Sequence, residues 1–582
     1  MTDRGAGGRR WLGLVAVALG VAMIVVDTTI VNVITPSVID DLHIDSTQAQ
    51  WVQESYAISF AALLLVFGRA ADILGARRVF TAGVLVFGAT SLLAGVAPSG
   101  GVLVAARFAQ GAGGAMLLPT SLSLLNQAFS GRERGQAFAI WGSTIGAASA
   151  VGPVVGGWLA GHASWRWAFG INIPLVVVIF VLTLAFIDPS PRVRGRIDVA
   201  SSVLSVLGLA ALSFGLIEGR TYGWITSASA FTLFGLKWDS GLSPAFVALE
   251  GAVALLAMFT WWQARLSRDG ARGQPLMDTR LFAIASFRNG NVATMIIGLG
   301  QFGIIAVVPL WLQFALGYTS LQAGFALLPL AGGAFFASAL SFGLAKRLSA
   351  LALVRIGLVV EAAGIAALGA VAAATSASWW AISLPLFTYG VGVGFATAQV
   401  TNVVLADVPP AEAGQGSGIQ STFRQLGSAL GIATLTTIFY SLLGSGVRTR
   451  LKGEHLAPGQ VDRYTAAVTD SAGAVIGAFA RSPATAGAAR AARDAMADGI
   501  AASSYAAAGL LAVGLLTTLL IPRAAPAARD RDRPVRLDEA LDLGPAVAEA
   551  RPVPRPRPAR HYQGRHRAGQ QGQVPAGPGP AG

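Results

Sequence analysis

The sequence predicts an all-α membrane protein with about fourteen transmembrane helices. Of its 582 residues, 54% are hydrophobic and only 12% are charged, which gives more apolar surface than one soluble core could bury. Apolar runs of about 20 residues recur along the chain, and this is the length that crosses a hydrocarbon core roughly 30 Å thick. Arginines fall mainly in the short connections after every second run. Lipid is therefore the expected solvent of this chain.

Fourteen apolar runs are long enough to span a bilayer. They fall near residues 11–33, 50–70, 79–97, 101–124, 136–160, 167–187, 198–218, 246–264, 289–314, 321–341, 352–373, 379–404, 418–442 and 501–522. The first run follows Arg9 and Arg10, a pattern that also resembles a secretory or twin-arginine signal peptide. Because the run is long and no small-residue cleavage site precedes the further runs, we expect it to remain as the first helix.

The distribution of basic residues indicates the orientation of the chain. Arginine or lysine follows runs two, four, six, eight and ten, at Arg77, Arg78, Arg132, Arg134, Arg192, Arg194, Arg196, Arg265, Arg268, Arg272, Arg280, Lys346 and Arg347. The connection at 34–49 contains neither residue type and carries three aspartates. Since cytoplasmic loops are enriched in basic residues, we expect a multi-pass protein of the cell (inner) membrane with both termini in the cytoplasm.

Three segments are predicted to lie outside the membrane. Residues 1–10 form a cytoplasmic N-terminus, and residues 443–500 form an extracellular loop whose Ala-rich part could be a surface helix. Basic residues in this loop run against the charge rule, but long loops cross largely regardless of charge. Residues 523–582 are rich in Pro, Arg and Gly, which predicts a disordered cytoplasmic tail. The tail either stays solvated or touches anionic lipid.

The composition excludes several classes of function. The net charge is +13 at pH 7, but the arginines do not gather on one face, so we expect no nucleic-acid partner. Cysteine is absent and the five histidines lack metal-ligand spacing, so we predict no metal and no cofactor. No GxxxxGK(S/T) phosphate-binding motif occurs in the chain. Any uphill transport would therefore draw on the proton gradient and not on ATP.

Two ionisable residues inside the runs share a depth. Asp27 lies about six residues before the outer end of the first run, roughly 9 Å deep at 1.5 Å per residue. Arg107 lies about six residues into the fourth run, which enters from the outside. Intramembrane charges are costly to bury and mark functional sites, and a carboxylate that alternates between an arginine and a proton can couple proton movement to transport. The alternative is a permanent salt bridge that only joins two helices.

Three other acidic residues lie in or near the runs. Glu54, beside Trp51 and Tyr56 at the outer start of the second run, is either a gate residue or an ordinary interfacial residue. Glu361, deep in the eleventh run, is either a second protonatable site or a carboxyl that burial keeps neutral. Glu218 ends the seventh run at the outside, where we expect no special role.

Several of these residues belong to motifs that resemble those of the major facilitator superfamily. The loop after the second run resembles its signature loop, with Gly68, Asp72, Gly75, Arg77 and Arg78. The fourth run resembles its arginine motif, with Arg107, Gln110, Gly111 and Gly113. The fifth run is similar to the motif of drug–proton antiporters, with Gly142, Gly146, Gly152, Pro153, Gly156 and Gly157. Three further segments resemble motifs of the superfamily's fourteen-span drug-exporter branch. They are residues 27–33 with Pro36, residues 165–167 before Asn172 and Pro174, and residues 424–427.

The resemblance, which covers residues 10–522, implies both an architecture and an activity. It implies six-helix bundles at 11–187 and 289–522, an inserted helix pair at 198–264, and a central cavity that opens alternately to each side. It also implies a monomer that exports small lipophilic compounds, such as drugs, antibiotics or related metabolites, in exchange for protons. Some cation exporters of the branch carry acids in the tenth and thirteenth runs. This sequence has none there, so a strongly dicationic substrate is not expected.

The motif residues also have physical roles that we predict from their chemistry. The glycines of the fifth run allow close helix packing, and Pro153 can bend that helix. Asp72 with Arg77 and Arg78 can form a charge latch at the cytoplasmic ends of neighbouring helices, closing that side in one state.

Two other functions stay open at this stage. A proton-coupled symporter that takes up a small solute would share the fold, and only the fifth-run motif and the fourteen-span pattern favour export. A membrane-embedded transferase would need an Asp, His or metal-ligand cluster at a membrane face, and the short loops contain none. We therefore expect a transporter and not an enzyme.

Overall fold

The computed structural model of the chain is predominantly helical. It describes residues 3–44, 46–229, 231–233, 236–238, 240–269, 275–344, 347–374, 378–453 and 456–521. These residues belong to one compact unit, Met1–Arg523. The predicted disordered tail at 523–582 lies outside the described residues.

Fourteen helices among the described residues are long and apolar enough to cross a membrane, as predicted. The first half contains α1 (Asp3–Leu42), α2 (Ser46–Leu74), α3 (Ala76–Gly95), α4 (Gly100–Ala128), α5 (Gly131–His162), α6 (Trp167–Gly170) and α7 (Asn172–Phe186). The inserted pair, α8 (Val199–Tyr222) and α9 (Pro244–Asp269), is joined through an antiparallel hairpin of β1 (Thr232–Leu233) and β2 (Leu236–Lys237). The second half contains the short helix η1 (Thr279–Ala283), α10 (Ala285–Leu310), the π-helical turn η2 (Trp311–Ala315), α11 (Ser320–Leu344), α12 (Ala350–Ala373), α13 (Trp379–Val404), η3 (Pro410–Glu412), α14 (Ala413–Gly453), α15 (Pro458–Asp470), α16 (Ile476–Ala480), η4 (Pro483–Thr485) and α17 (Ala486–Leu519).

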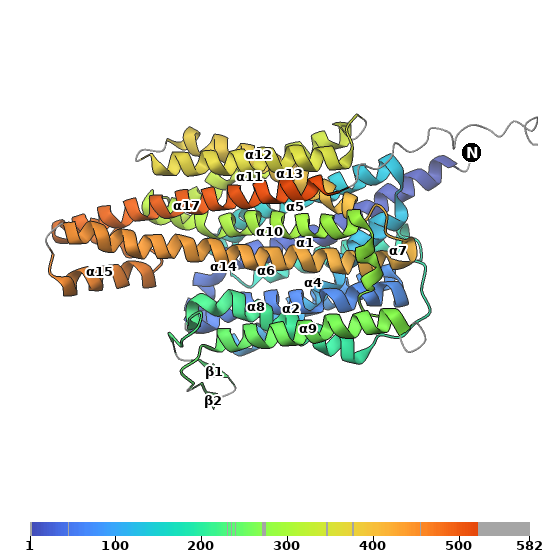
Figure 1. Cartoon of the computed structure of the whole chain (residues 1–582), viewed down its shortest axis with the longest axis horizontal. Coiled ribbons are helices and arrows are strands. Elements are labelled where there is room, and N and C mark those ends of the chain that lie inside the picture. Colours follow the sequence, from blue (N-terminus) through green and yellow to red (C-terminus); the bar gives the residue numbers. More distant parts are fainter. Residues whose placement is uncertain are drawn as a thin grey trace, which may run out of the picture. The chain divides into compact units, whose positions relative to one another are not determined.

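The long helices run side by side (Figure 1). Within the first half, α1 packs against α5 and α7, and α4 packs against α2 and α3. Within the second half, α10 packs against α14, and α12 packs against α13 and α17. The two halves meet where α2 and α4 contact α14 and where α5 contacts α11 and α13. The inserted helices α8 and α9 pack on each other, and α8 also contacts α2 and α14.

The sixth predicted span is interrupted. The sequence predicted one helix over 167–187, but the structure has α6 and α7, which meet at Ile171. The break makes Asn172 the first residue of α7, and the Asn172 side chain is completely buried. This local interruption therefore puts a polar side chain inside the first half.

The segment 443–500, predicted as an extracellular loop with a possible Ala-rich helix, is largely helical. Helix α14 continues to Gly453 and α17 begins at Ala486, so both project beyond the other helices together with α15 (Figure 1). A hydropathy profile places the end of a span where charged residues appear. In these segments the helices continue, because their charges are paired and their apolar residues are buried. Arg450 Nη2 lies 2.5 Å from Asp498 Oδ2, and buried side chains from both helices join one core cluster.

Candidate functional site

A buried carboxylate lies in the interior of the first half. Asp27 of α1 is completely buried, and Arg107 of α4 is 1% exposed. The Arg107 Nη1 group donates a hydrogen bond to Asp27 Oδ2 at 2.5 Å. The structure therefore brings together the two charges that share a depth in the sequence. Each charge offsets the desolvation cost of the other.

Polar side chains from three further positions complete this site. Gln110 Nε2 and Asn172 Nδ2 donate to Asp27 Oδ1 at 2.8 Å and 3.1 Å. Both amides also donate to Ser91 Oγ, at 2.8 Å and 3.2 Å. We call Asp27, Ser91, Arg107, Gln110 and Asn172 the Asp27 cluster. Both carboxylate oxygens accept hydrogen bonds, so the cluster is built for a charged Asp27.

The arginine of the cluster also binds α2. Arg107 Nε donates to the backbone carbonyl oxygen of Val52 at 3.1 Å, and its guanidinium carbon lies 4.3 Å from the centre of the Tyr56 ring. Arg107 Nη1 also donates to Gln110 Oε1 at 2.7 Å. A change in the charge of Asp27 would therefore act on the position of α2 through Arg107.

The glycines of α5 pack against the helix that carries Asp27. A Cβ atom at Gly156 would lie 2.7 Å from Ile30 Cγ1, and one at Gly152 would lie 2.9 Å from Thr29 Cβ. A Cβ at Gly146 would meet the Ala334 Cβ of α11, in the second half, at 3.2 Å. Helix α5 thus contacts both the turn of α1 next to Asp27 and the opposite half of the protein. No side chain larger than hydrogen fits at Gly152 or Gly156 without displacing α1.

Three further residues of the fifth-run motif also belong to α5. Gly142 is half-buried. Pro153 and Gly157 are residues of the same helix, and their surroundings lie outside the described part of the structure.

The end of α2 opposite Glu54 contacts the second half through Gly68 and Asp72. A Cβ at Gly68 would lie 2.7 Å from the Cα of Gly418 in α14. Asp72 is 4% exposed, and its two carboxylate oxygens accept the backbone N–H groups of Gly414 and Gln415, each at 2.7 Å. Carboxylates are favoured at helix N-termini, where free N–H groups carry partial positive charge. Asp72 therefore binds the first turn of the 41-residue helix α14.

The two arginines of the signature loop contact other groups. Gly75 separates α2 from α3 with a φ of +95°, a backbone conformation that glycine adopts without steric cost. Arg77 Nη2 donates to the carbonyl oxygen of Leu184 at 2.8 Å, and Arg78 is exposed. In this structure the arrangement differs from the predicted latch, because Asp72 engages a helix N-terminus and the Arg77 side chain engages the last turn of α7.

Glu54 is buried, and so is Glu218, for which the sequence predicted no special role. Their side chains are 8% and 1% exposed. Gln50 Nε2 donates to Glu54 Oε1 at 2.6 Å and to Glu218 Oε2 at 3.3 Å. The inserted helix α8 packs against α2 and buries both side chains, so the wet environment expected for Glu54 is not found, and the gate and interfacial alternatives for Glu54 stay open. Sequence reasoning missed the pairing because hydropathy does not show where an inserted helix docks.

Glu361 lies apart from the other acidic candidates. It is completely buried in α12, and among the described residues neither carboxyl oxygen has a hydrogen-bond partner. Gly392 of α13 lies directly against its backbone. A buried carboxyl without a cation or donor is stable only when it carries a proton, which favours the neutral-carboxyl alternative. In the part of the chain described, no three His, Asp or Glu side chains are grouped to hold a metal ion.

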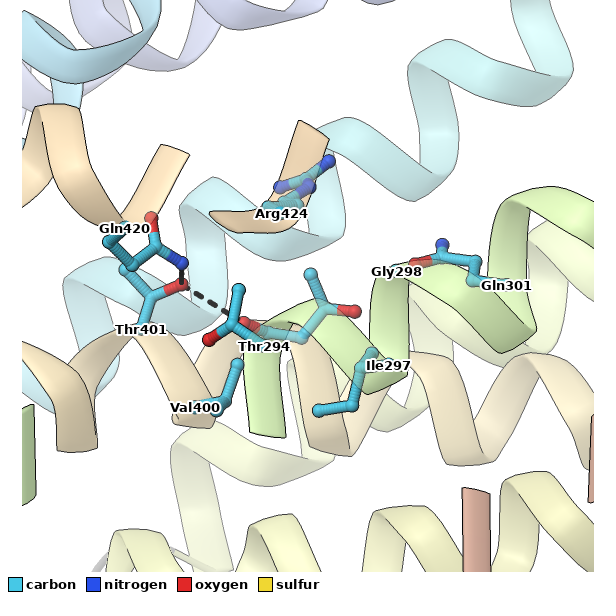
Figure 2. Close-up of a pocket in the computed structure, with 9 residues that line it drawn as sticks. Thr294, Ile297, Gly298, Gln301, Val400, Thr401, Gln420 and Arg424 are labelled. Atoms are coloured by element: carbon cyan, nitrogen blue, oxygen red, sulfur yellow. Dashed lines mark hydrogen bonds between the residues drawn. The ribbon is translucent and has the colours of Figure 1, made fainter. Parts of the chain in front are cut away.

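A small pocket lies between α10, α13 and α14 in the second half (Figure 2). Polar side chains from all three helices line it, and Gln420 Nε2 donates to Thr401 Oγ1 at 3.2 Å. The remaining lining residues are Thr294, Ile297, Gly298, Gln301, Thr397, Val400 and Arg424. The Arg424 guanidinium carbon lies 6.0 Å from the ring centres of Trp141 in α5 and Phe302 in α10. The sequence showed Arg424 only as part of a motif, and its facing into a pocket required the fold.

A surface ion pair joins the last turn of α1 to the connection between α5 and α6. Asp41 forms an ion pair with Arg166 and accepts a hydrogen bond from Trp165 Nε1 at 3.0 Å. The hydrogen bonds from Arg166 and Trp165 lower the pKa of Asp41 below its ordinary 3.8. Asp41 therefore stays ionised above about pH 5, unlike a group that exchanges protons during transport.

The chain is similar to known proteins over most of its length. Residues 17–432 match the family described as Major Facilitator Superfamily. The probable actinorhodin transporter of Streptomyces coelicolor is 32% identical over 449 residues, which cover 75% of this chain and 74% of that protein. The puromycin resistance protein pur8 of Streptomyces alboniger is 31% identical over 483 residues, which cover 80% and 90%. The crystal structure of the human organic anion transporter MFSD10 has a similar fold, with a TM-score of 0.56 and 12% identity across 88% of this chain and 99% of that one.

Proposed function

Because the chain belongs to the major facilitator superfamily and is a multi-pass membrane transporter, not an enzyme, we propose that it exports small lipophilic compounds in exchange for protons. Drugs, antibiotics and related metabolites are the substrate class. The names of the relatives support this class, since one is called a probable transporter of actinorhodin and another a puromycin resistance protein. The observation that carries the proton-coupling part of the proposal is the Asp27 cluster.

The proposed coupling reaction is the exchange of one proton at Asp27. In the charged state, Arg107 and the amides of Gln110 and Asn172 hold the carboxylate. A proton on the carboxylate removes the charge that Arg107 neutralises, so the pair loses its Coulomb attraction while Arg107 keeps its bond to the Val52 carbonyl. Protonation thus weakens the link between α1 and the α2–α4 pair. This two-state behaviour is the minimum that an antiporter needs.

The proposed route from Asp27 to the rest of the protein runs through packed helices. Gly152 and Gly156 hold α5 against the turn of α1 next to Asp27, and Gly146 holds α5 against α11. A shift of α1 would therefore move the contact between the two halves. At the other end of α2, the bond from Asp72 to the first turn of α14 closes the protein in this state. Breaking that bond would open the same end.

The orientation, location, oligomeric state and bundle boundaries that we propose are those predicted from the sequence. The end at which Asp72 lies is the cytoplasmic one, both termini are cytoplasmic, and the protein is a monomer in the cell (inner) membrane. The six-helix bundles are assigned to residues 11–187 and 289–522, with the inserted pair at 198–264. The charge distribution along the connections supports this orientation.

The pocket beside Arg424 is proposed to contact the polar group of the substrate. Arg424, whose guanidinium lies near the rings of Trp141 and Phe302, supplies a cation, and Gln420 and Thr401 supply hydrogen-bonding groups. A site with this chemistry favours flat apolar compounds that carry a neutral or acidic polar group. It disfavours dications, in agreement with the absence of acidic residues from the tenth and thirteenth runs.

Transport driven by an imposed proton gradient tests the proposal. The purified protein is placed in liposomes with a pH difference across the membrane, and the movement of puromycin and of a fluorescent lipophilic dye is followed. Antiport predicts that the compound moves uphill against the direction of proton flow, and that an uncoupler abolishes this movement. Movement in the same direction as the protons would instead identify the uptake symporter, the second function that the fold allows.

A further inference from the structure

A second pair of acidic residues lies where the inserted helix α8 meets α2. Glu54 and Glu218 come from different helices, and both side chains are more than nine-tenths buried. The two carboxyls lie next to each other, since one amide nitrogen reaches both of them. One amide nitrogen, Gln50 Nε2, lies within 2.6 Å of Glu54 Oε1 and 3.3 Å of both Glu218 Oε2 and Thr221 Oγ1. The two hydrogens of this amide cannot serve three acceptors.

The charge balance of this pair requires a proton. Glu54 Oε2 is buried, and among the described residues no donor reaches it. Among the described residues, the Tyr222 hydroxyl also faces both glutamates, and this group is neutral at pH 7. The basic residue two positions after Glu218, Arg220, places its guanidinium carbon 3.5 Å from the ring centre of Tyr440 in α14. Two buried carboxyls that lie next to each other, with no cation beside them, cannot both be ionised.

We propose that Glu54 and Glu218 share one proton, which forms a second proton-binding site and fastens the inserted helix α8 to α2. The proton lies between Glu54 Oε2, which otherwise has no donor, and the Glu218 carboxyl. Gln50 donates to Glu54 Oε1 and to Glu218 Oε2. The shared proton turns a repulsive contact between α2 and α8 into a hydrogen bond, so loss of the proton to solvent drives the two helices apart.

The geometry of α2 connects this site to the Asp27 cluster. Arg107 of the cluster contacts α2 at the Val52 carbonyl and the Tyr56 ring. At about 100° per residue, position 54 lies on the face of α2 opposite both 52 and 56. One turn of α2 therefore lies between two proton sites, with the inserted pair attached to the second. This arrangement gives α8 and α9 a role in responding to pH, beyond filling space beside the bundles.

Infrared spectroscopy of the purified full-length protein tests the shared proton without any transport assay. Wild type at neutral pH is expected to show a carbonyl band from one protonated carboxyl of the pair. Glu54→Gln and Glu218→Gln should each remove that band, so it should appear in each wild-type-minus-variant difference spectrum, in which the band of the neutral Glu361 carboxyl cancels. In either variant the remaining carboxylate gains a second amide donor and loses its like-charged neighbour. Glu250→Gln, on the exposed face of α9, is the matched control and should leave the spectrum unchanged.

Three results would overturn the shared proton. Loss of the band in only one of the two variants would show a single neutral acid. Retention of the band in both variants would show that neither glutamate carries the proton. Loss of the wild-type band on addition of Ca²⁺ or Mg²⁺ would show a carboxylate site for a divalent cation. Because none of these readouts involves transport, the result is independent of whether Asp27 couples export to protons.

Discussion

Asp72 Oδ1 accepts the backbone N–H of Gly414 at 2.7 Å, although the two residues lie 342 positions apart in the chain. This bond and its partner to Gln415 join the two halves at one end of α2. We predict that Asp72→Asn weakens this closure by about 1 kcal/mol, because the amide keeps one acceptor but loses the charge that favours a helix N-terminus. That cost corresponds to a roughly fivefold larger open fraction.

Single-cysteine labelling measures this opening cleanly, because the chain has no cysteine of its own. With Gln420→Cys as the reporter inside the pocket, Asp72→Asn should speed labelling by a membrane-permeant thiol reagent. Asp188→Asn, which removes an exposed ion pair with Arg9, is the control and should leave the rate unchanged. Equal labelling rates in wild type and Asp72→Asn would rule out Asp72 as part of the closure.

Replacing Arg107 by leucine should destabilise the protein strongly. Asp27 would then be a buried carboxylate without its cation, and breaking a buried pair in this way costs about 3–5 kcal/mol. Asp27→Asn removes that charge, so the double variant should be more stable than Arg107→Leu alone. Thermal unfolding in detergent measures both effects. Additive losses in the double variant would contradict a direct energetic link between Asp27 and Arg107.

Gly152→Val should impair transport more than it impairs membrane insertion. Even a Cβ atom at this position would lie 2.9 Å from Thr29 Cβ and 3.1 Å from the Val26 carbonyl oxygen, so α5 must move away from α1. Gly251→Val in the membrane helix α9, where a Cβ meets no atom within 4 Å, is the control for a general effect of valine in a membrane helix. Dye efflux at matched protein levels is the measurement. Normal efflux by Gly152→Val would show that this contact carries no part of the cycle.

Arg424→Gln should change substrate choice and leave energy coupling intact. The substitution removes a cation from the pocket beside Trp141 and Phe302, so export of acidic aromatic compounds should fall at least tenfold relative to neutral compounds of similar size. Arg424→Lys keeps the charge and should restore part of the loss. Competition assays with matched acidic and neutral dyes measure the ratio. An unchanged ratio in Arg424→Gln would remove Arg424 from the substrate site.

The pH dependence of transport should not come from Asp41. Its pKa lies below the ordinary 3.8 because Arg166 and Trp165 hydrogen-bond to its ionised form. A lowered pKa gives stability that is present at neutral pH and is lost only as the pH falls through the folded-state value. Asp41→Asn should therefore leave the pH profile of transport unchanged between about pH 5.5 and 8. A shifted profile would mean that the Arg166 pair takes part in proton movement.

The sequence predicted the depth of Asp27 and Arg107 but not the groups around them. Depth follows from counting residues along spans of known length, so the pair could be inferred. The contacts of Gln110 and Asn172 with Asp27 depend on helix rotation and on the break before α7. Hydropathy contains neither quantity. The number of spans was predictable because it also follows from counting apolar residues against a known bilayer thickness.

Contacts between distant segments were the least predictable. The bond between Asp72 and the N-terminus of α14 joins the two halves, and the pairing of Glu54 with Glu218 depends on where the inserted α8 docks. A helix was predicted for the Ala-rich start of α17, but the extension of α14 to Gly453 was not, because its buried contacts lie between charged residues that end a hydropathy window. Local patterns therefore identified the candidate residues, and tertiary packing determined their partners.

Comparison of Asp27→Asn with wild type in two assays is the most direct test of proton coupling through Asp27. The first assay is uphill movement of puromycin or dye driven by a pH gradient, and the second is exchange of the same compound across liposomes at equal pH. We predict that Asp27→Asn loses uphill transport and retains exchange, because the asparagine keeps the Asp27 cluster folded but cannot carry the proton. Uphill transport by Asp27→Asn with its pH dependence intact would contradict this role of Asp27.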